Sequence, residues 1–135
     1  MIMRRERIGK TGIMHLDEIA RATLATKIHM ATVTNANVAY EGSITIDADL
    51  LEETGIIPYE QVTVSNVNNG ERFDTYVIAG RAGSGEICLN GPTARKGVVG
   101  DQVIIFCYGY FEATEVGVSM PKIIRLDSNN QIMKG

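Results

Sequence analysis

The stretch QVTVSNVNNGERFDTYVIA, residues 61–79, decides the fold class of this chain of 135 residues. Residues 62–65 alternate apolar and polar side chains, which is the pattern of a strand with one buried face. Asn68-Asn69-Gly70 is a strong hairpin signal. We therefore expect strands at 61–67 and 72–79, joined by a tight turn.

Further short strands are expected on both sides of this hairpin. Their apolar runs lie at 27–33, 44–46, 86–90, 102–110, 122–127 and 131–133. Asp47 is placed to cap a short helix at Ala48–Thr54, and Gly55 is placed to end it. Many short strands with turn signals predict a mainly β fold, a small barrel or sandwich with one or two helical turns.

Composition narrows the class of protein. The hydrophobic fraction is 44% and the charged fraction 21%, as in a folded globular domain. A net charge of -3 argues against a protein held to nucleic acid by bulk electrostatics. No apolar run has the length of a membrane span or of a signal peptide, so we expect a cytoplasmic protein with no membrane contact.

The N-terminal residues differ from the rest of the chain in charge and in hydrophobic pattern. Residues 1–18 begin with the basic side chains of Arg4, Arg5, Arg7 and Lys10 and show no apolar periodicity. We expect a mobile, solvated arm at 1–18, with contact to a partner as the alternative, and one β-barrel domain at 19–135.

Cysteine and histidine usage predicts no metal site. Cys88 and Cys107 both lie in apolar strand-like runs, so two buried free thiols in a reduced compartment are expected. His15 and His29 are the only histidines, and neither takes part in a zinc-binding spacing.

Four local features could carry chemistry, although each has an ordinary structural explanation. Gly42-Ser43 reads as a turn, but it is also the pair that a self-cleaving peptide bond needs, because glycine permits the distorted backbone that serine attack requires. Arg72, Asp74 and Tyr76 share one strand face, opposite Phe73, and could line a polar pocket. The other two features are the basic pair Lys27 and His29 on one strand face, and the Asn90-Gly91-Pro92-Thr93 turn.

Taken together and in this order, these features resemble the aspartate 1-decarboxylase family, whose members are small pyruvoyl-dependent enzymes that make β-alanine for pantothenate synthesis. The resemblance runs from about residue 21 to near residue 134. It is densest at 27–29, 33–47, 67–78, 85–91 and 100–105.

The resemblance implies a double-psi β-barrel and a homotetramer with active sites between neighbouring subunits. It implies autocatalytic cleavage between Gly42 and Ser43, with Ser43 becoming a pyruvoyl group that accepts L-aspartate without any metal. Thr75 and Asn90 correspond to self-processing residues, and Tyr76 to the proton donor. The positions that correspond to the substrate-binding site are Lys27, Arg72, Thr75, Gly91, Pro92 and Thr93, and those that line its pocket are His29 and Tyr40.

The sequence departs from the family pattern at one place. Small alanines typically follow the glycine that matches Gly91, whereas this chain has Pro92 and Thr93. Proline removes a backbone amide that could bind an anion. Two alternatives to an aspartate decarboxylase stay open at this point: a small β-barrel binding module that uses its basic arm, and a pyruvoyl-dependent decarboxylase of another acidic amino acid.

Overall fold

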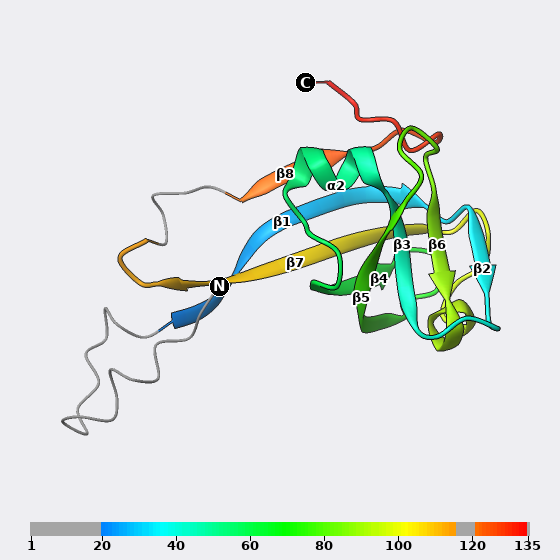
Figure 1. Ribbon diagram of the computed structural model, residues 1–135, viewed down its shortest axis with the longest axis horizontal. Helices are drawn as coiled ribbons and strands as arrows, with labels where there is room; N and C mark the ends of the chain where they lie inside the picture. Colours follow the sequence, from blue (N-terminus) through cyan, green and yellow to red (C-terminus); the bar gives the residue numbers. More distant parts are fainter. Residues whose placement is uncertain (1–19, 116–120, 135) are drawn as a thin grey trace.

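The computed structural model describes residues 20–115 and 121–134, and the expected arm at 1–18 lies outside them. These residues form a curved sheet of strands, with one short helix and one 3-10 helix beside it (Figure 1). The elements are β1 (Ala20–Thr32), β2 (Asn35–Asn37), β3 (Ser43–Asp47), α2 (Ala48–Thr54), β4 (Gln61–Asn66), β5 (Arg72–Gly80), β6 (Ile87–Asn90), η2 (Gly91–Arg95), β7 (Gln102–Glu112) and β8 (Lys122–Arg125).

The strands form one sheet in the order β2-β6-β3-β5-β4-β7-β1-β8. The predicted hairpin is present, since β4 and β5 pair antiparallel. Strands distant in sequence pair in parallel: β3 with β5, β2 with β6, and β1 with β8. The prediction of a small, mainly β barrel with one or two short helices is confirmed.

The core lies inside the curved sheet and consists mainly of branched aliphatic side chains. Alternate residues of β4 and β7 point inward, so Val62, Val64, Val103 and Ile105 are almost fully buried. Phe73 packs against this cluster, as the alternation along β5 predicts. The neighbouring residues of each strand are consequently displayed on the outer face of the sheet.

Local sequence signals explain α2. The Asp47 carboxylate caps the helix by accepting the Asp49 amide at 2.8 Å, and Gly55 ends it in the left-handed conformation at φ 79°. The same carboxylate also accepts the amides of Gly83 at 3.0 Å and Gly85 at 2.8 Å. Asp47 therefore joins the helix start to the loop that precedes β6.

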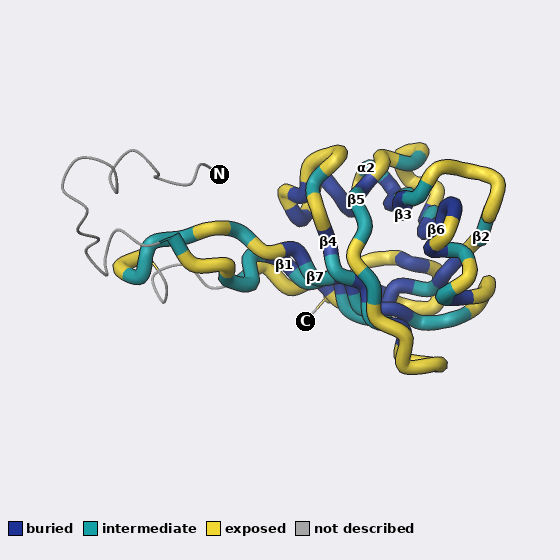
Figure 2. Tube along the Cα trace, turned by 90° about the horizontal axis from the view of Figure 1, so that it is seen from below, coloured by how far each residue is buried: buried dark blue, intermediate teal, exposed yellow. Residues whose placement is uncertain are grey.

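Two strand predictions differ from the structure. β1 begins at Ala20, seven residues before the predicted start, because its first half pairs with the end of β7 in a two-stranded ribbon that projects from the barrel (Figure 2). The pairing shifts register between Ile28 and Ala31, where Met30 has φ 63°. At the C-terminal end, the predicted strand at 131–133 is only a single bridge from Leu126 to Ile132.

Candidate active site

Ser43 begins β3 and is completely buried. It lies directly opposite Asn90 in the antiparallel pairing of β3 with β6. The Nδ2 atom of Asn90 donates to Ser43 Oγ at 2.9 Å and to Thr45 Oγ1 at 2.8 Å. Both protons of the Asn90 amide are thus used to hold hydroxyl groups of β3.

The Cys88 thiol orients this amide. Its Sγ atom donates to Asn90 Oδ1 at 3.1 Å, because residues two apart on β6 present their side chains to the same side. Burial, with a smaller effect of the negative charge on Glu86, raises the pKa of Cys88, so the thiol keeps the proton that it donates. Cys88 and Cys107 are both free and buried, as the sequence predicts.

The turn after β6 is a 3-10 helix, η2, and it faces Ser43. The Thr93 hydroxyl lies 2.7 Å from the main-chain oxygen of Asn90 and 3.2 Å from that of Ser43. Pro92 occupies the first turn of η2, where a missing amide proton costs little. The two residues that depart from the family pattern are therefore neighbours of the predicted cleavage site.

Thr75 and Tyr76 lie on β5, directly before its parallel pairing with β3 begins. The parallel β3–β5 ladder begins at Ile44 opposite Val77, which are the residues that follow Ser43 and Tyr76. Thr75 pairs with the inward-facing Val62, whereas the Tyr76 ring lies on the outer face. Tyr76 stacks there on Tyr59 with a centroid distance of 6.2 Å.

The outer face of the sheet carries the basic side chains. Phe106 of β7 pairs with Lys27 of β1 on one side and with Thr63 of β4 on the other. The guanidinium of Arg72 lies over the Phe106 ring at 5.2 Å, and its Nη1 donates to Ser65 Oγ at 2.7 Å. Lys27 and Arg72 thus share a face that is organised around Phe106.

In the described part of the chain, neither His29 nor Tyr40 makes a side-chain hydrogen bond to another predicted site residue. The Nδ1 atom of His29 is buried and has no hydrogen-bond partner among the described residues. Burial, together with the positive charges of Lys27 and Arg125, lowers the pKa of His29. The Tyr40 side chain is 65% exposed, on the turn that leads to Ser43.

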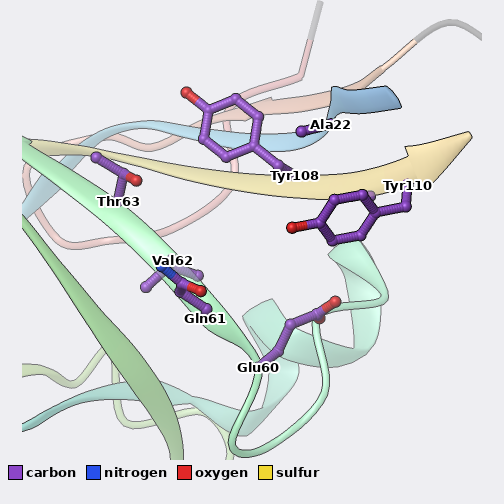
Figure 3. Close-up of a pocket in the computed structure, with 8 residues that line it drawn as sticks. Ala22, Glu60, Gln61, Val62, Thr63, Tyr108 and Tyr110 are labelled. Carbon is purple, nitrogen blue, oxygen red and sulfur yellow. The ribbon is translucent and has the colours of Figure 1, made fainter. Parts of the chain in front are cut away.

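A pocket of about 300 Å³ opens beside the outer face, between β4 and β7 (Figure 3). Figure 3 shows the Tyr108 and Tyr110 rings on one side and Glu60 with Gln61 on the other. Gln61 pairs with Tyr76, so the pocket adjoins the face that carries the tyrosine, although no predicted site residue lines it.

The predicted site residues therefore form two groups in one chain. In the inner group Asn90 holds the buried hydroxyl of Ser43 and Thr93 contacts its main-chain oxygen. The residues of the outer group lie on β1 and β5. Among the described residues, Lys27 and Arg72 make no hydrogen bond or ion pair with Ser43. The inner group comprises Gly42, Ser43, Thr75, Asn90, Gly91, Pro92 and Thr93, and the outer group comprises Lys27, His29, Arg72 and Tyr76. The exposed Tyr40 belongs to neither group.

Sequence reasoning missed four residues that hold the predicted ones in place. Thr45 and Cys88 bind the Asn90 amide, and Ser65 and Phe106 hold the Arg72 guanidinium. For the first two a signal existed, because each lies two positions from a singled-out residue on the same strand. No local signal pointed to Ser65 or Phe106, which meet Arg72 only through strand pairing.

Other kinds of site are not found in the described part of the chain. No group of three or more His, Cys, Asp or Glu side chains there is arranged to hold a metal ion. Nor does that part contain a helix with the length and apolar character needed to cross a membrane.

Comparison with known proteins identifies the family of this chain. The family model for aspartate decarboxylase matches residues 19–133. The aspartate 1-decarboxylase of Caldicellulosiruptor saccharolyticus is 57% identical over 111 residues, which cover 82% of this chain and 87% of that protein. The Bacillus cytotoxicus aspartate 1-decarboxylase is 54% identical over 114 residues, 84% of this chain and 90% of its own. The chain thus belongs to the aspartate decarboxylase family.

Proposed function

We propose that this protein decarboxylates L-aspartate to β-alanine and CO2, using a pyruvoyl group made from its own Ser43. The observation that carries the proposal is a fully buried serine hydroxyl that follows a glycine and accepts a hydrogen bond from an asparagine amide. The family to which the chain belongs supports the choice of aspartate as substrate.

The residues around Ser43 fit a pyruvoyl group. The pairing of Ser43 with Asn90 of β6 fixes its main chain, and Asn90 and Thr93 supply polar contacts to its side chain and carbonyl. A pyruvoyl carbonyl, once formed there, supplies an electron sink for the bond that breaks when a carboxylate leaves as CO2.

The inner residues perform the maturation. Ser43 Oγ attacks the carbonyl carbon of Gly42, and the Asn90 amide holds that oxygen and stabilises negative charge on it as its proton leaves. Thr75, which corresponds to a self-processing residue of the family, donates its hydroxyl to the oxyanion that develops on the Gly42 carbonyl. The glycine has no side chain to obstruct this approach.

The outer residues bind the substrate and move its proton. Arg72 uses one of its five N–H donors in the hydrogen bond to Ser65, and the remaining donors can bind a substrate carboxylate in a bidentate manner. Lys27, on the same face, adds a second positive charge. The Tyr76 phenol delivers a proton to the carbon from which CO2 has left.

We infer a homotetramer in which the outer residues of one subunit serve the Ser43 of its neighbour. Lys27 and Arg72 make no hydrogen bond or ion pair with the Ser43 of the same chain in its described part, which supports a site completed by a second copy. The projecting ribbon of β1 and β7 (Figure 2) leaves Tyr108 and Tyr110 about two-fifths exposed, as suits a surface that packs against another subunit. The two free thiols fit a cytoplasmic location.

The reaction is tested by measuring CO2 release from L-aspartate and from L-glutamate side by side. Intact mass spectrometry of the same sample reports how much of the chain is cleaved. We expect cleaved protein to release CO2 from aspartate and to prefer it strongly over glutamate. Preference for glutamate would reassign the substrate, and a folded chain that stays uncut and inactive would remove the proposed function.

A further inference from the structure

The Thr93 hydroxyl has an unusual position relative to Ser43. It is buried, and its Oγ1 lies 3.2 Å from the main-chain oxygen of Ser43 and 2.7 Å from that of Asn90. A hydroxyl has one proton, so these two carbonyl oxygens compete for it. The hydroxyl is therefore already close to a second acceptor when the first accepts its hydrogen bond.

The backbone around Thr93 is held tightly against the segment that is cleaved. Gly91 has φ +64°, and a Cβ atom there would overlap the main-chain oxygen of Tyr40 and lie 2.8 Å from the amide nitrogen of Gly42. A Cβ atom at Gly42 would in turn contact the Pro92 ring at 3.5 Å. Because only glycine fits at position 91, η2 sits directly on residues 40–42 and fixes where the Thr93 hydroxyl points.

Maturation of the proposed kind has two bond-breaking steps that place charge on different oxygens. In the first, Ser43 Oγ bonds to the carbonyl carbon of Gly42, the peptide bond to the Ser43 nitrogen breaks, and the hydroxyl proton passes to that nitrogen, which leaves an ester and a free amine. In the second, solvent water takes the proton from Ser43 Cα, those electrons form a double bond to Cβ, and the bond from Cβ to Oγ breaks. Gly42 then leaves as a carboxylate, and water later replaces the nitrogen as ammonia.

The second step puts negative charge on the atom that Thr93 contacts. When the Cα proton of Ser43 leaves, its electron pair is shared with the adjacent main-chain carbonyl, whose oxygen becomes an enolate. A hydrogen bond to an anionic oxygen is stronger than one to a neutral carbonyl. The Thr93 hydroxyl therefore makes its strongest hydrogen bond when it turns from the main-chain oxygen of Asn90 to that of Ser43 in the transition state of the elimination.

We propose that Thr93 is a catalytic residue of self-cleavage, whose hydroxyl stabilises the enolate oxygen of Ser43 during the elimination step. The inference rests on the proposed function, because it assumes that the chain makes its pyruvoyl group from Ser43. It gives the Thr93 side chain a role in maturation, separate from the substrate contact that the family resemblance implies for this position.

Two other roles would use the same hydroxyl. The 2.7 Å bond to Asn90 is of the kind that starts a helical turn, so Thr93 could act only on the local fold. Alternatively, the hydroxyl could bind the substrate, in which case it would affect turnover and leave maturation alone. Each alternative predicts a different result for the variants below.

The test follows maturation of the full chain in Thr93→Val, Thr93→Ser and the parent. Valine keeps the shape of threonine and removes the hydroxyl, whereas serine keeps the hydroxyl. Intact mass measures cleavage over time. The ester has the same mass as the precursor, so a sample of each is also treated with neutral hydroxylamine, which cuts the ester between residues 42 and 43. Cuts at the Asn-Gly bonds 69–70 and 90–91 give other masses and are recognised as such.

We expect Thr93→Val to mature about 100- to 1,000-fold more slowly than the parent, as for loss of one oxyanion donor. Its uncut chain should remain sensitive to hydroxylamine at 42–43, because the first step does not need Thr93. Thr93→Ser should mature within a few-fold of the parent rate. Maturation of Thr93→Val at the parent rate overturns the proposal, and so does a folded, uncut Thr93→Val chain that resists hydroxylamine.

Thr93→Ala is a third variant, and it keeps the comparison decisive if Thr93→Val does not fold. Alanine is the small residue that the family pattern leads us to expect near this position. Thr93→Ala should mature as slowly as Thr93→Val, and equal rates for Thr93→Ala and Thr93→Ser would overturn the proposal. Failure of the parent chain itself to cleave is a different result, since it removes the proposed function.

Discussion

The Nδ2 atom of Asn90 lies 2.9 Å from the Oγ atom of Ser43, across the antiparallel pair formed by β3 and β6. The amide is held in this direction from its other end, where Oδ1 accepts the Cys88 thiol. A side chain that is bonded at both ends costs little entropy to position. The serine oxygen is thus placed before any reaction begins.

Cleavage at this serine is the first expected outcome. Prolonged incubation should convert the parent chain to two polypeptides, residues 1–42 and 43–135. Only the shorter should yield to N-terminal sequencing, because the longer would begin with a ketone. Intact mass spectrometry measures both.

Ser43→Ala is the matched control for cleavage. It lacks the attacking oxygen, so it should stay a single, folded and inactive chain. If the parent chain decarboxylated aspartate while remaining full length, the pyruvoyl mechanism would have to be abandoned.

The Cys88 thiol should help to hold the Asn90 amide toward Ser43. Cys88→Val removes the donor and leaves the buried Asn90 Oδ1 without its partner, at an expected cost of about 1–3 kcal/mol in the free energy of unfolding. It should also slow cleavage, because the amide is no longer held toward Ser43. Cys88→Ser keeps a donor and should be closer to the parent in both. Urea unfolding of the uncleaved chains and maturation kinetics measure the two effects, and equal cleavage rates for valine and serine would contradict this role.

Thr75 and Tyr76 should separate maturation from turnover. Tyr76→Phe loses only the phenolic proton and should cleave normally while its kcat falls, because the phenol acts after the cofactor exists. Thr75→Val should instead cleave slowly, by about 100-fold or more, since it loses an oxyanion donor. Mass spectrometry reports cleavage and CO2 release reports kcat. A parent-like kcat in Tyr76→Phe would show that another group donates the proton.

The sharing of sites between subunits predicts complementation. Arg72→Ala should mature but bind aspartate poorly, and Ser43→Ala should not mature. In oligomers of both, one subunit supplies an intact Ser43 and its neighbour an intact Arg72. Co-expression should therefore restore activity that neither variant has alone. Mixed oligomers as inactive as their parts would place Arg72 and Ser43 of each site in the same subunit.

The pKa of His29 predicts a stability change in mildly acidic solution. Burial, Lys27 and Arg125 lower this pKa from 6.5 in the folded protein. Between 6.5 and the lowered value the unfolded chain binds a proton that the folded protein does not, so the free energy of unfolding falls as the pH falls. The urea concentration at the midpoint of unfolding is measured at pH 7.5 and pH 5.5, at one protein concentration. The difference between the two pH values should be smaller for His29→Gln than for the parent. An identical pH dependence in both would exclude His29 as the cause.

The parts of the structure that can be predicted from the sequence alone are those that depend on interactions between residues close together in the chain. The helix at Ala48–Thr54 follows from a capping carboxylate at Asp47 and a glycine at its end, and both effects act within one turn. The shared face of Arg72, Asp74 and Tyr76 follows from the two-residue period of a strand. The hairpin between β4 and β5 needs only its turn and the alternation on either side.

Tertiary structure decided what these residues meet. Phe106 lies between Lys27 and Thr63, with Arg72 over its ring, only because β1, β7 and β4 are neighbours in the sheet. Thr93 faces Ser43 because Gly91 allows η2 to sit on the 40–42 segment. Such contacts join residues up to about 80 positions apart, and strand register selects them by burying one face of the whole sheet, which no local pattern specifies.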